Sequence, residues 1–388
     1  MTIGVGMGVL SGVGRTGVST TFVLTCTTTG AQTLTISQLG VVAGKTVTVT
    51  WGDGTSNAYT GALTRTHAYA GAGTWTITFQ NKNDISTLSI SDSKIGGTID
   101  AGNILPQGLT QLALYGTTGL TWVVGPSSPM PPNLTYLNLY NLDITWTINA
   151  TNPMPSNLTY LQLQDSGITW TINAANPIPS GITILHLRAG TNLTWIVADA
   201  PLPAGLTNLD LYNISGITWT VGPSTPMPTG LTSIILSIDA GSFNWTIGPS
   251  APMPAGVTFL ELTYTTAIRL SWTANASNPL PAGLVNLRVN TCPGITIASD
   301  QWTRNGLQLV QYNNALNQAA VDAVLLAIWA NKANYTYSAP VLTLLGSSNA
   351  APSGVYQSMN PPTTGNEAKY DLINDVPTPG PAWAVTTA

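Results

Sequence analysis

Charged residues are scarce in this 388-residue chain: Asp, Glu, Lys and Arg together make up 7% of it, against about a quarter in an ordinary soluble protein. Eleven basic residues and a net charge of −4 leave no basic patch dense enough to neutralise nucleic-acid phosphates. We therefore expect no nucleic-acid partner. Surface polarity must come from Thr, Asn, Ser and Gln, whose side chains suit hydrogen bonding to proteins, sugars or neighbouring subunits.

Cysteine is nearly absent, and long apolar runs are absent altogether. Cys26 and Cys292 lie far apart, and no cluster of Cys with His has the spacing of a zinc site, so we expect two buried free thiols, no metal and no cofactor. No apolar run reaches the roughly 20 residues of a membrane span, which argues against membrane insertion. The first basic residue, Arg15, follows an apolar start, whereas a secretory signal carries positive charge first. We expect no such signal.

Tryptophan recurs along the chain with a nearly constant period. Spacings of 24 to 27 residues separate seven tryptophans, which are Trp122, Trp146, Trp170, Trp195, Trp219, Trp245 and Trp272. A Pro-x-Pro element keeps the same period, and after it comes L-x-x-L-x-L or a close variant, as at Leu134, Leu137 and Leu139. Eight copies of the leucine pattern are present. A fixed period of this length predicts a solenoid of stacked repeats.

Each repeat is expected to contain two short strands joined by turns. The first, T-x-L-x-L, alternates between outward and inward side chains, and the second, I-T-W-T-I, as at 144–148, has Ile and Trp on one face and Thr on the other. A single repeat cannot bury its apolar face, whereas stacked repeats align identical positions into ladders. We therefore predict an interior tryptophan column.

The repeat pattern resembles leucine-rich repeats in which a β-strand replaces the usual convex-side helix. The phrase L-P-A-G-L-T-N-L-D-L at 202–211 looks like the repeats of bacterial surface proteins and of phage tail or head fibres. The resemblance covers about half the chain and implies a two-stranded solenoid over residues 91–300. It is specific for the fold and not for a function, because such scaffolds host many partners.

Residues 21–90 carry a different set of motifs. W-G-D-G-T at 51–55 is followed by H-A-Y at 67–69 and G-T-W-T-I at 73–77. This order resembles the polycystic-kidney-disease type of immunoglobulin-like sandwich. The resemblance implies a β-sandwich in which Asp53 and His67 stabilise the fold and catalyse nothing.

The remaining segments are expected to seal and anchor the repeats. Residues 301–388 lose the tryptophan period and resemble the C-terminal cap of such solenoids, with one helix over 315–333, Asn317 as its N-cap, a closing strand from Val341 and an extended arm over 377–388. Residues 1–20 are Gly-rich and apolar, and we interpret them as an anchor arm. The predicted fold class is thus mainly β: a sandwich, a solenoid of about 24-residue repeats, and a cap containing one helix.

No catalytic constellation is evident. His186, Arg188 and Asp210 fall on outward positions of neighbouring repeats, either as a polar cluster on the concave face or as a solvated ladder. Asp210 and Glu261 lie two repeats apart, roughly 10 Å by strand spacing, which is slightly too far for a glycosidase pair. We expect no enzymatic activity.

The best candidate binding surface is formed by the outward positions of the first strand of each repeat. These positions are Tyr115, Tyr136, Asn138, Tyr140, Tyr160, Gln162, His186, Arg188, Asn208, Asp210, Tyr212, Phe259 and Glu261. Exposed Tyr with Asn and Gln is the composition of adaptable binding faces. The alternative explanation is that Tyr simply favours strands.

The resemblances imply a non-enzymatic phage protein at the virion surface, a head or tail fibre or decoration, that binds a host protein or glycan. Its N-terminal arm would bind other virion or filament proteins, and the chain would form a homo-oligomer. The alternative is a bacterial cell-surface adhesin or a subunit of an extracellular filament. A polysaccharide-degrading enzyme is a third and weaker interpretation.

Overall fold

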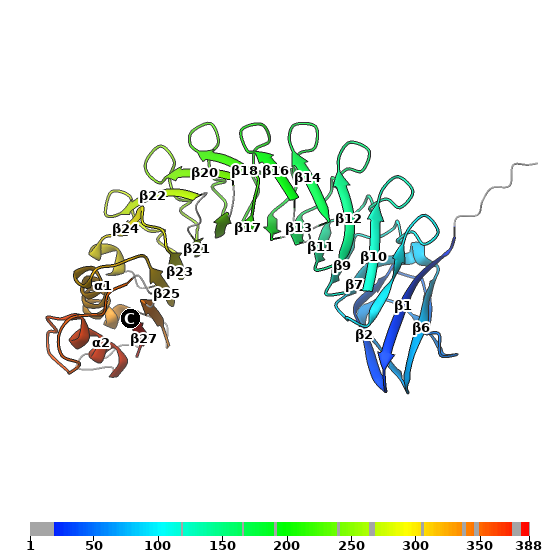
Figure 1. Ribbon diagram of the computed structural model, residues 1–388, viewed down its shortest axis with the longest axis horizontal. Coiled ribbons are helices and arrows are strands. Elements are labelled where there is room, and N and C mark those ends of the chain that lie inside the picture. The colour runs from blue at the N-terminus through cyan, green and yellow to red at the C-terminus, as the bar shows by residue number, and fades with distance from the viewer. Residues whose placement is uncertain are drawn as a thin grey trace, which may run out of the picture.

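The protein is an arch-shaped β-solenoid, and a different small unit covers each of its ends (Figure 1). Each coil of the solenoid is called a turn below. The computed structural model describes residues 19–117, 119–164, 167–189, 192–238, 241–263, 268–303, 306–335, 339–344, 349–374 and 382–387. The interpretation of residues 1–20 as an arm falls almost wholly outside these residues. A solenoid with a period of about 24 residues is confirmed, and the mainly β fold class with it.

One strand of each turn lies on the concave side of the arch and the other on its convex side (Figure 1). The concave strands are β9 (Gln111–Tyr115), β11 (Tyr136–Tyr140), β13 (Tyr160–Gln164), β15 (Ile184–Arg188), β17 (Asn208–Ile214), β19 (Ser233–Ile238), β21 (Phe259–Thr263), β23 (Asn286–Asn290) and β25 (Leu309–Asn313). The convex strands are β10 (Gly119–Val124), β12 (Asp143–Ile148), β14 (Ile168–Ile172), β16 (Asn192–Ile196), β18 (Ile217–Val221), β20 (Gly241–Thr246), β22 (Ile268–Ala274) and β24 (Ile295–Ile297). Neighbouring strands on each side pair in parallel.

The concave strands align identical repeat positions, as the sequence pattern predicts. Leu137 pairs with Leu161, and Leu139 with Leu163, so the leucines form in-register ladders beneath the sheet. A threonine precedes each concave strand from β9 to β21 and adds a second ladder, because its hydroxyl and its amide both donate to the carbonyl of the equivalent residue one turn earlier. Thr135, for example, donates to the carbonyl of Thr110 and is followed in the ladder by Thr159.

The convex strands do not align identical positions, and here the expectation of an in-line tryptophan ladder is wrong. Trp146 pairs with Ile168, and Ile148 with Trp170, so each strand is displaced by two residues relative to the one before it. No repeat tryptophan therefore pairs with another, and each lies between aliphatic or phenylalanine residues of the neighbouring strands, as Trp146 lies between Val124 and Ile168. The displacement preserves the face of every side chain, because strand periodicity is two. The apolar faces still point inward.

All seven repeat tryptophans are buried, with exposed fractions of 0–2%. Each indole nitrogen also donates a hydrogen bond into the loop that follows its strand. In six turns the acceptor is a backbone carbonyl, such as that of Asn152 for Trp146, and in the first turn it is the hydroxyl of Ser128 for Trp122. The tryptophans thus fill the interior and fix the outer loops that lead into the Pro-x-Pro elements.

Glycine before the I-T-W-T-I strand is required by close backbone contact. A Cβ atom added to Gly167 would lie 1.6 Å from the carbonyl oxygen of Ile144, and one added to Gly216 would lie 1.8 Å from that of Leu193. Gly216 also has a φ of +80°, which side chains rarely adopt. These glycines allow one turn to pack directly on the previous turn.

The N-terminal unit is built from two small antiparallel sheets that continue into the two long sheets of the arch. Its strands are β1 (Thr21–Thr29), β2 (Gln32–Val41), β3 (Val47–Thr50), β4 (Ser56–Tyr59), β5 (Ala62–Tyr69), β6 (Ala72–Gln80), β7 (Ile85–Ile90) and β8 (Ile95–Ile99), with a 3-10 turn η1 (Lys82–Asp84). Strand β7 pairs antiparallel with β2 and parallel with β9, and β8 does the same with β1 and β10. β7 and β8 therefore form a turn that precedes the eight predicted copies.

The C-terminal unit covers the last turns. It contains η2 (Ser299–Thr303), α1 (Gln318–Ala330), η3 (Lys332–Asn334), β26 (Val341–Leu344), α2 (Gly365–Asn374) and β27 (Ala384–Thr387). Helix α1 and its N-cap are confirmed, since the Asn317 side chain accepts from the amide of Ala320 at 2.9 Å. Helix α2 was not predicted. The prediction of an extended arm is wrong for 384–387, because β27 pairs with β26 and extends the concave sheet.

The core runs without interruption through all three units. Cys26 and Cys292 are both buried and are not joined in a disulfide, and burial raises the pKa of the Cys26 thiol to about 11, with Asp92 adding to the effect. Both thiols therefore belong to the core, and the Cys26 thiol stays protonated at neutral pH.

Candidate functional site

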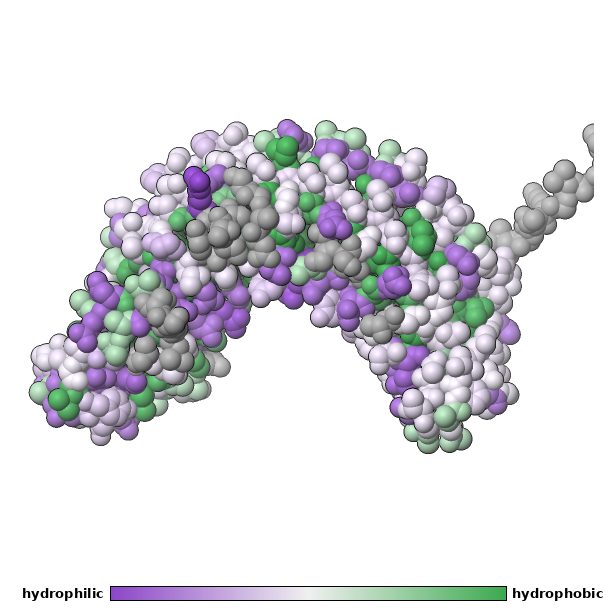
Figure 2. Space-filling model, in the orientation of Figure 1, coloured by the Kyte–Doolittle hydropathy of each residue, from purple (hydrophilic) through white to green (hydrophobic). Residues whose placement is uncertain are grey.

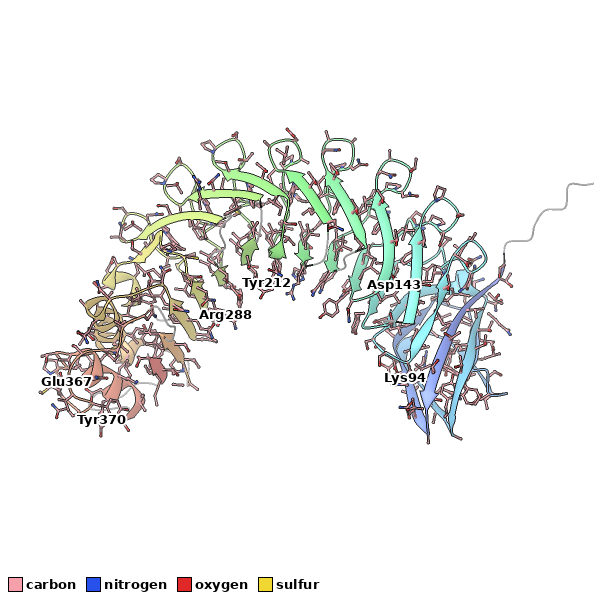
Figure 3. All side chains as sticks on the ribbon, viewed as in Figure 1. Lys94, Asp143, Tyr212, Arg288, Glu367 and Tyr370 are labelled. Carbon is pink, nitrogen blue, oxygen red and sulfur yellow. The ribbon has the colours of Figure 1, made fainter. Side chains whose placement is uncertain are left out.

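A single column of outward side chains runs along the middle of the concave sheet. Pairing between neighbouring strands places these residues in one line, from the N-terminal to the C-terminal end: Ser89, Ala113, Asn138, Gln162, His186, Asp210, Ile235, Glu261, Arg288, Gln311 and Thr343. We call this line the central column. Hydrophilic residues gather along the inner rim of the arch in Figure 2, and Tyr212 and Arg288 project from it in Figure 3.

An aromatic cluster lies beside the central column on β11, β13 and β15. The rings of Tyr136 and Tyr160 stack with centroids 4.2 Å apart and planes 15° from parallel, and the His186 ring meets Tyr160 edge-on at 5.8 Å. The Tyr160 hydroxyl donates to the side-chain oxygen of Gln162 at 2.8 Å. Burial and the neighbouring Tyr136 raise the pKa of Tyr160, so its hydroxyl stays a donor. The cluster is rigid and uncharged.

Arg188 and Asp210 form an ion pair next to this cluster. Two guanidinium nitrogens of Arg188 donate to the same carboxylate oxygen, Oδ2 of Asp210, at 2.9 and 2.5 Å. Asp210 is only 2% exposed, so a solvated ladder of outward side chains does not describe this position. The Arg188 side chain, 36% exposed, lies between the carboxylate and solvent. Burial raises the pKa of Asp210, and the Arg188 charge opposes that effect.

Polar atoms without a partner recur on this face. The second carboxylate oxygen of Asp210, Oδ1, is buried and accepts no hydrogen bond, and the same holds for the side-chain oxygens of Asn138 and Gln164. Burying such an atom without a hydrogen bond costs about 1–3 kcal/mol. A bound molecule that donates to these oxygens would recover that cost.

His186 sits between the tyrosines and the ion pair. Burial, and then the charge of Arg188, lower the pKa of His186 from its ordinary 6.5 to about 4. The ring is therefore neutral at physiological pH.

We expect His186 to make the fold lose stability as the pH falls from about 6.5 to about 4. In that window the unfolded chain binds a proton at this ring and the folded chain does not, so acid favours unfolding. His186→Gln places there the residue that Gln162 supplies one turn earlier, and it should flatten the pH dependence of the melting temperature within this window. Identical pH profiles for the variant and the parent would contradict the assignment. Asp53, whose pKa is lowered to about 2, also loses its contribution in acid, but it is present in both proteins, so the difference between their pH profiles reports His186.

A second ion pair, which the sequence analysis did not predict, lies further along the column. Nη1 of Arg288 contacts Oε2 of Glu261 at 3.0 Å, and its guanidinium carbon lies 5.5 Å from the centroid of the Phe259 ring. Glu261 and Phe259 were candidates, whereas Arg288 was not. The alternation on β23 would have placed Arg288 in the central column.

The other predicted residues lie on the same face at its two margins. Tyr140 and Tyr212 are 38% and 45% exposed, and Asn208 is half-buried on the margin that holds Tyr136 and Tyr160. Tyr115 lines a groove of about 360 Å³ where the N-terminal unit meets the first turns. We call this the junction groove. Its walls are Gln38, Thr87, Leu88, Ser89, Gln111, Ala113, Tyr115, Tyr136 and Asn138.

Asp53 and His67, in the N-terminal unit, form a compact structural contact. His67 Nε2 lies 2.7 Å from Oδ2 of Asp53, and the His67 ring stacks on Trp51 at 4.6 Å. Burial tends to raise the pKa of Asp53, but hydrogen bonds from Thr55 and His67 outweigh it and lower the pKa to about 2. The Tyr69 hydroxyl donates to the carbonyl of Trp51. These contacts fix the turn between β3 and β4.

Among the described residues no group of three or more His, Cys, Asp or Glu side chains could hold a metal ion. Within those ranges, α1 and α2 are both too short to cross a bilayer, and no other helix has the length and apolarity for it.

No protein-family model, curated protein or solved structure matches the chain.

Proposed function

We propose that this protein is a non-enzymatic binding protein that presents its concave sheet to a partner at the surface of a phage virion, as a head or tail fibre or decoration. The binding role is inferred from the side chains of the concave face. This face combines stacked tyrosines, amide side chains and buried oxygen atoms that lack a partner. Rigid aromatics with adaptable polar neighbours give contact area at low entropic cost.

The virion assignment is supported by the resemblance of the repeats to those of phage fibres and bacterial surface proteins. In this proposal residues 1–20 bind other virion or filament proteins, copies of the chain associate, and the concave face binds a host protein or glycan. The alternative is a bacterial cell-surface adhesin or filament subunit, which would use the same face. Immunogold labelling of purified particles and of whole cells distinguishes the two locations.

The binding role is tested by changing Tyr136, Tyr140 and Tyr160 together to Ser. Truncating buried aromatic contacts commonly costs about 2 kcal/mol or more each, so we expect attachment of the labelled protein to host cells to fall by more than about tenfold. A matched control changes Val123 and Ile196 to Ser, since these side chains are 65% and 46% exposed on the convex sheet. Circular dichroism and melting establish that both variants fold. Attachment that survives the tyrosine changes would refute the role of this face.

A further inference from the structure

We propose that the junction groove is a binding site for a neutral saccharide, a short segment of a hydroxyl-rich glycan chain. This inference rests on the proposed binding role of the concave face and names the chemistry that one part of that face recognises.

The groove exists because the central column begins with two small side chains. Ser89 and Ala113 occupy positions that Asn138, Gln162 and His186 hold in the next three turns. Ala113 lies at the floor of the groove and is only 7% exposed. The volume of about 360 Å³ is at the lower end of the range of roughly 300–1,000 Å³ for small-molecule sites.

The lining is polar and carries no charge. Gln38, Gln111 and Asn138 contribute amides, and Ser89 and Thr87 contribute hydroxyls. The side-chain oxygen of Asn138 is buried and has no hydrogen-bond partner. A sugar hydroxyl that displaces the atoms covering that oxygen can donate to it and also accept from the amide nitrogens. A charged ligand would meet no opposite charge in this lining, so desolvating it would be costly.

An aromatic ring borders the groove on one side. Tyr136 is held in place by its stack on Tyr160, which covers the side facing β13. The opposite side faces β9, the strand that supplies Gln111 and Ala113 to the groove. An ordered aromatic ring gives the apolar C–H face of a sugar a surface to pack on, with little loss of conformational entropy.

The grooves on the convex side have a different character. One of about 440 Å³ and another of about 290 Å³ lie between neighbouring Pro-x-Pro loops. Their walls consist mainly of Pro, Met and Ala side chains, with few hydrogen-bonding groups. The junction groove alone, among these three, combines an aromatic ring with several amides and hydroxyls.

The test is binding of defined tetrasaccharides to the full chain, measured by saturation-transfer NMR and calorimetry. The probes are maltotetraose, cellotetraose, mannotetraose and chitotetraose, with tetragalacturonate as the acidic comparison. We expect at least one neutral probe to bind and Ala113→Gln to weaken it at least tenfold, because the new side chain fills the groove. Thr343→Gln introduces the same residue near the C-terminal end of the concave sheet, far from the groove, and should leave binding unchanged. Asn138→Leu, which removes the unpaired acceptor, should also weaken binding and serves if Ala113→Gln fails to fold.

Three results would overturn the proposal: no neutral probe binds, the groove variants bind as well as the parent, or the acidic probe binds at least as tightly. The cell-attachment assay separates this proposal from the broader one. If no sugar binds but the triple tyrosine variant loses attachment, the saccharide site is wrong and the concave face retains its role. If the sugar binds in the groove but the triple variant still attaches, the binding site stands and the proposed role in attachment fails.

Discussion

Trp146→Ala should lower the free energy of unfolding by about 3–5 kcal/mol, the range for truncating a buried aromatic side chain. Trp146 is fully buried, and its place in the staggered convex sheet puts it against Ile168 of the next turn. The substitution leaves a cavity that the neighbouring turns cannot close without losing their own hydrogen bonds. It also removes the indole donor to the carbonyl of Asn152, so the outer loop loses its attachment to the core.

Denaturant titration followed by circular dichroism measures the effect. Trp146→Phe keeps most of the apolar volume and removes the donor, and we expect it to lie between the parent and the alanine variant. Thr147→Ala, at the exposed neighbouring position, controls for strand propensity. An alanine variant that unfolds at the same denaturant concentration as the parent would show that the tryptophans do not support the stack.

Arg188→Ala should destabilise the fold by up to about 3 kcal/mol at neutral pH, because it leaves the Asp210 carboxylate buried without a counter-charge. One Asp210 oxygen already lacks a partner, so the two donors from Arg188 are the main compensation for its burial. Without them the carboxyl group is stable in the fold only when protonated. The loss should therefore be small near pH 4, close to the ordinary Asp pKa of about 3.9, and grow as the pH rises.

The double variant Arg188→Ala with Asp210→Ile provides the control for this pair. Ile235 occupies the next position of the central column, so this sheet accepts isoleucine there. Removing both charges should restore most of the stability lost in the single variant. A single variant as stable as the parent at pH 7 would mean that the ion pair contributes nothing. If the double variant is as unstable as the single one, the stability lost in Arg188→Ala comes from the packing of the arginine side-chain stem and not from its charge.

The solenoid could be predicted from the sequence because its signal is periodic and repeated. The tryptophan interval and the leucine pattern predict two strands in each turn and the buried face of each strand. They also predict that the turns stack. The displacement of two residues between convex strands could not be predicted. It changes no side chain's face, so both registers satisfy the same alternation of apolar and polar residues.

The candidate site was predicted in outline only. Alternation placed Tyr136, Gln162 and His186 on the concave face, but burial of Asp210 depends on how Arg188 of the preceding turn folds over it. The junction groove depends on the pairing of β7 with β9, which joins two segments with unrelated patterns. Its one signal in the sequence is the small residue Ala113, which occupies a position where later repeats have larger polar residues. Helix α2 is only 10 residues long, carries no repeat and contains few apolar residues, so its sequence resembles that of the surrounding polar tail.

Because β7 and β8 pair with strands on both sides, hydrogen bonds join every turn to the next from the N-terminal unit to the cap, on the concave sheet through β26 and β27. The described chain contains no break between these units at which one could swing against the other. The arch should therefore respond to load as a curved elastic strip does, by sharing a small change of angle among all its turns. A force that pulls its two ends apart would straighten the arch gradually, and the arch would regain its curvature when the force is removed. The curvature of the concave sheet would therefore report the tension on the molecule.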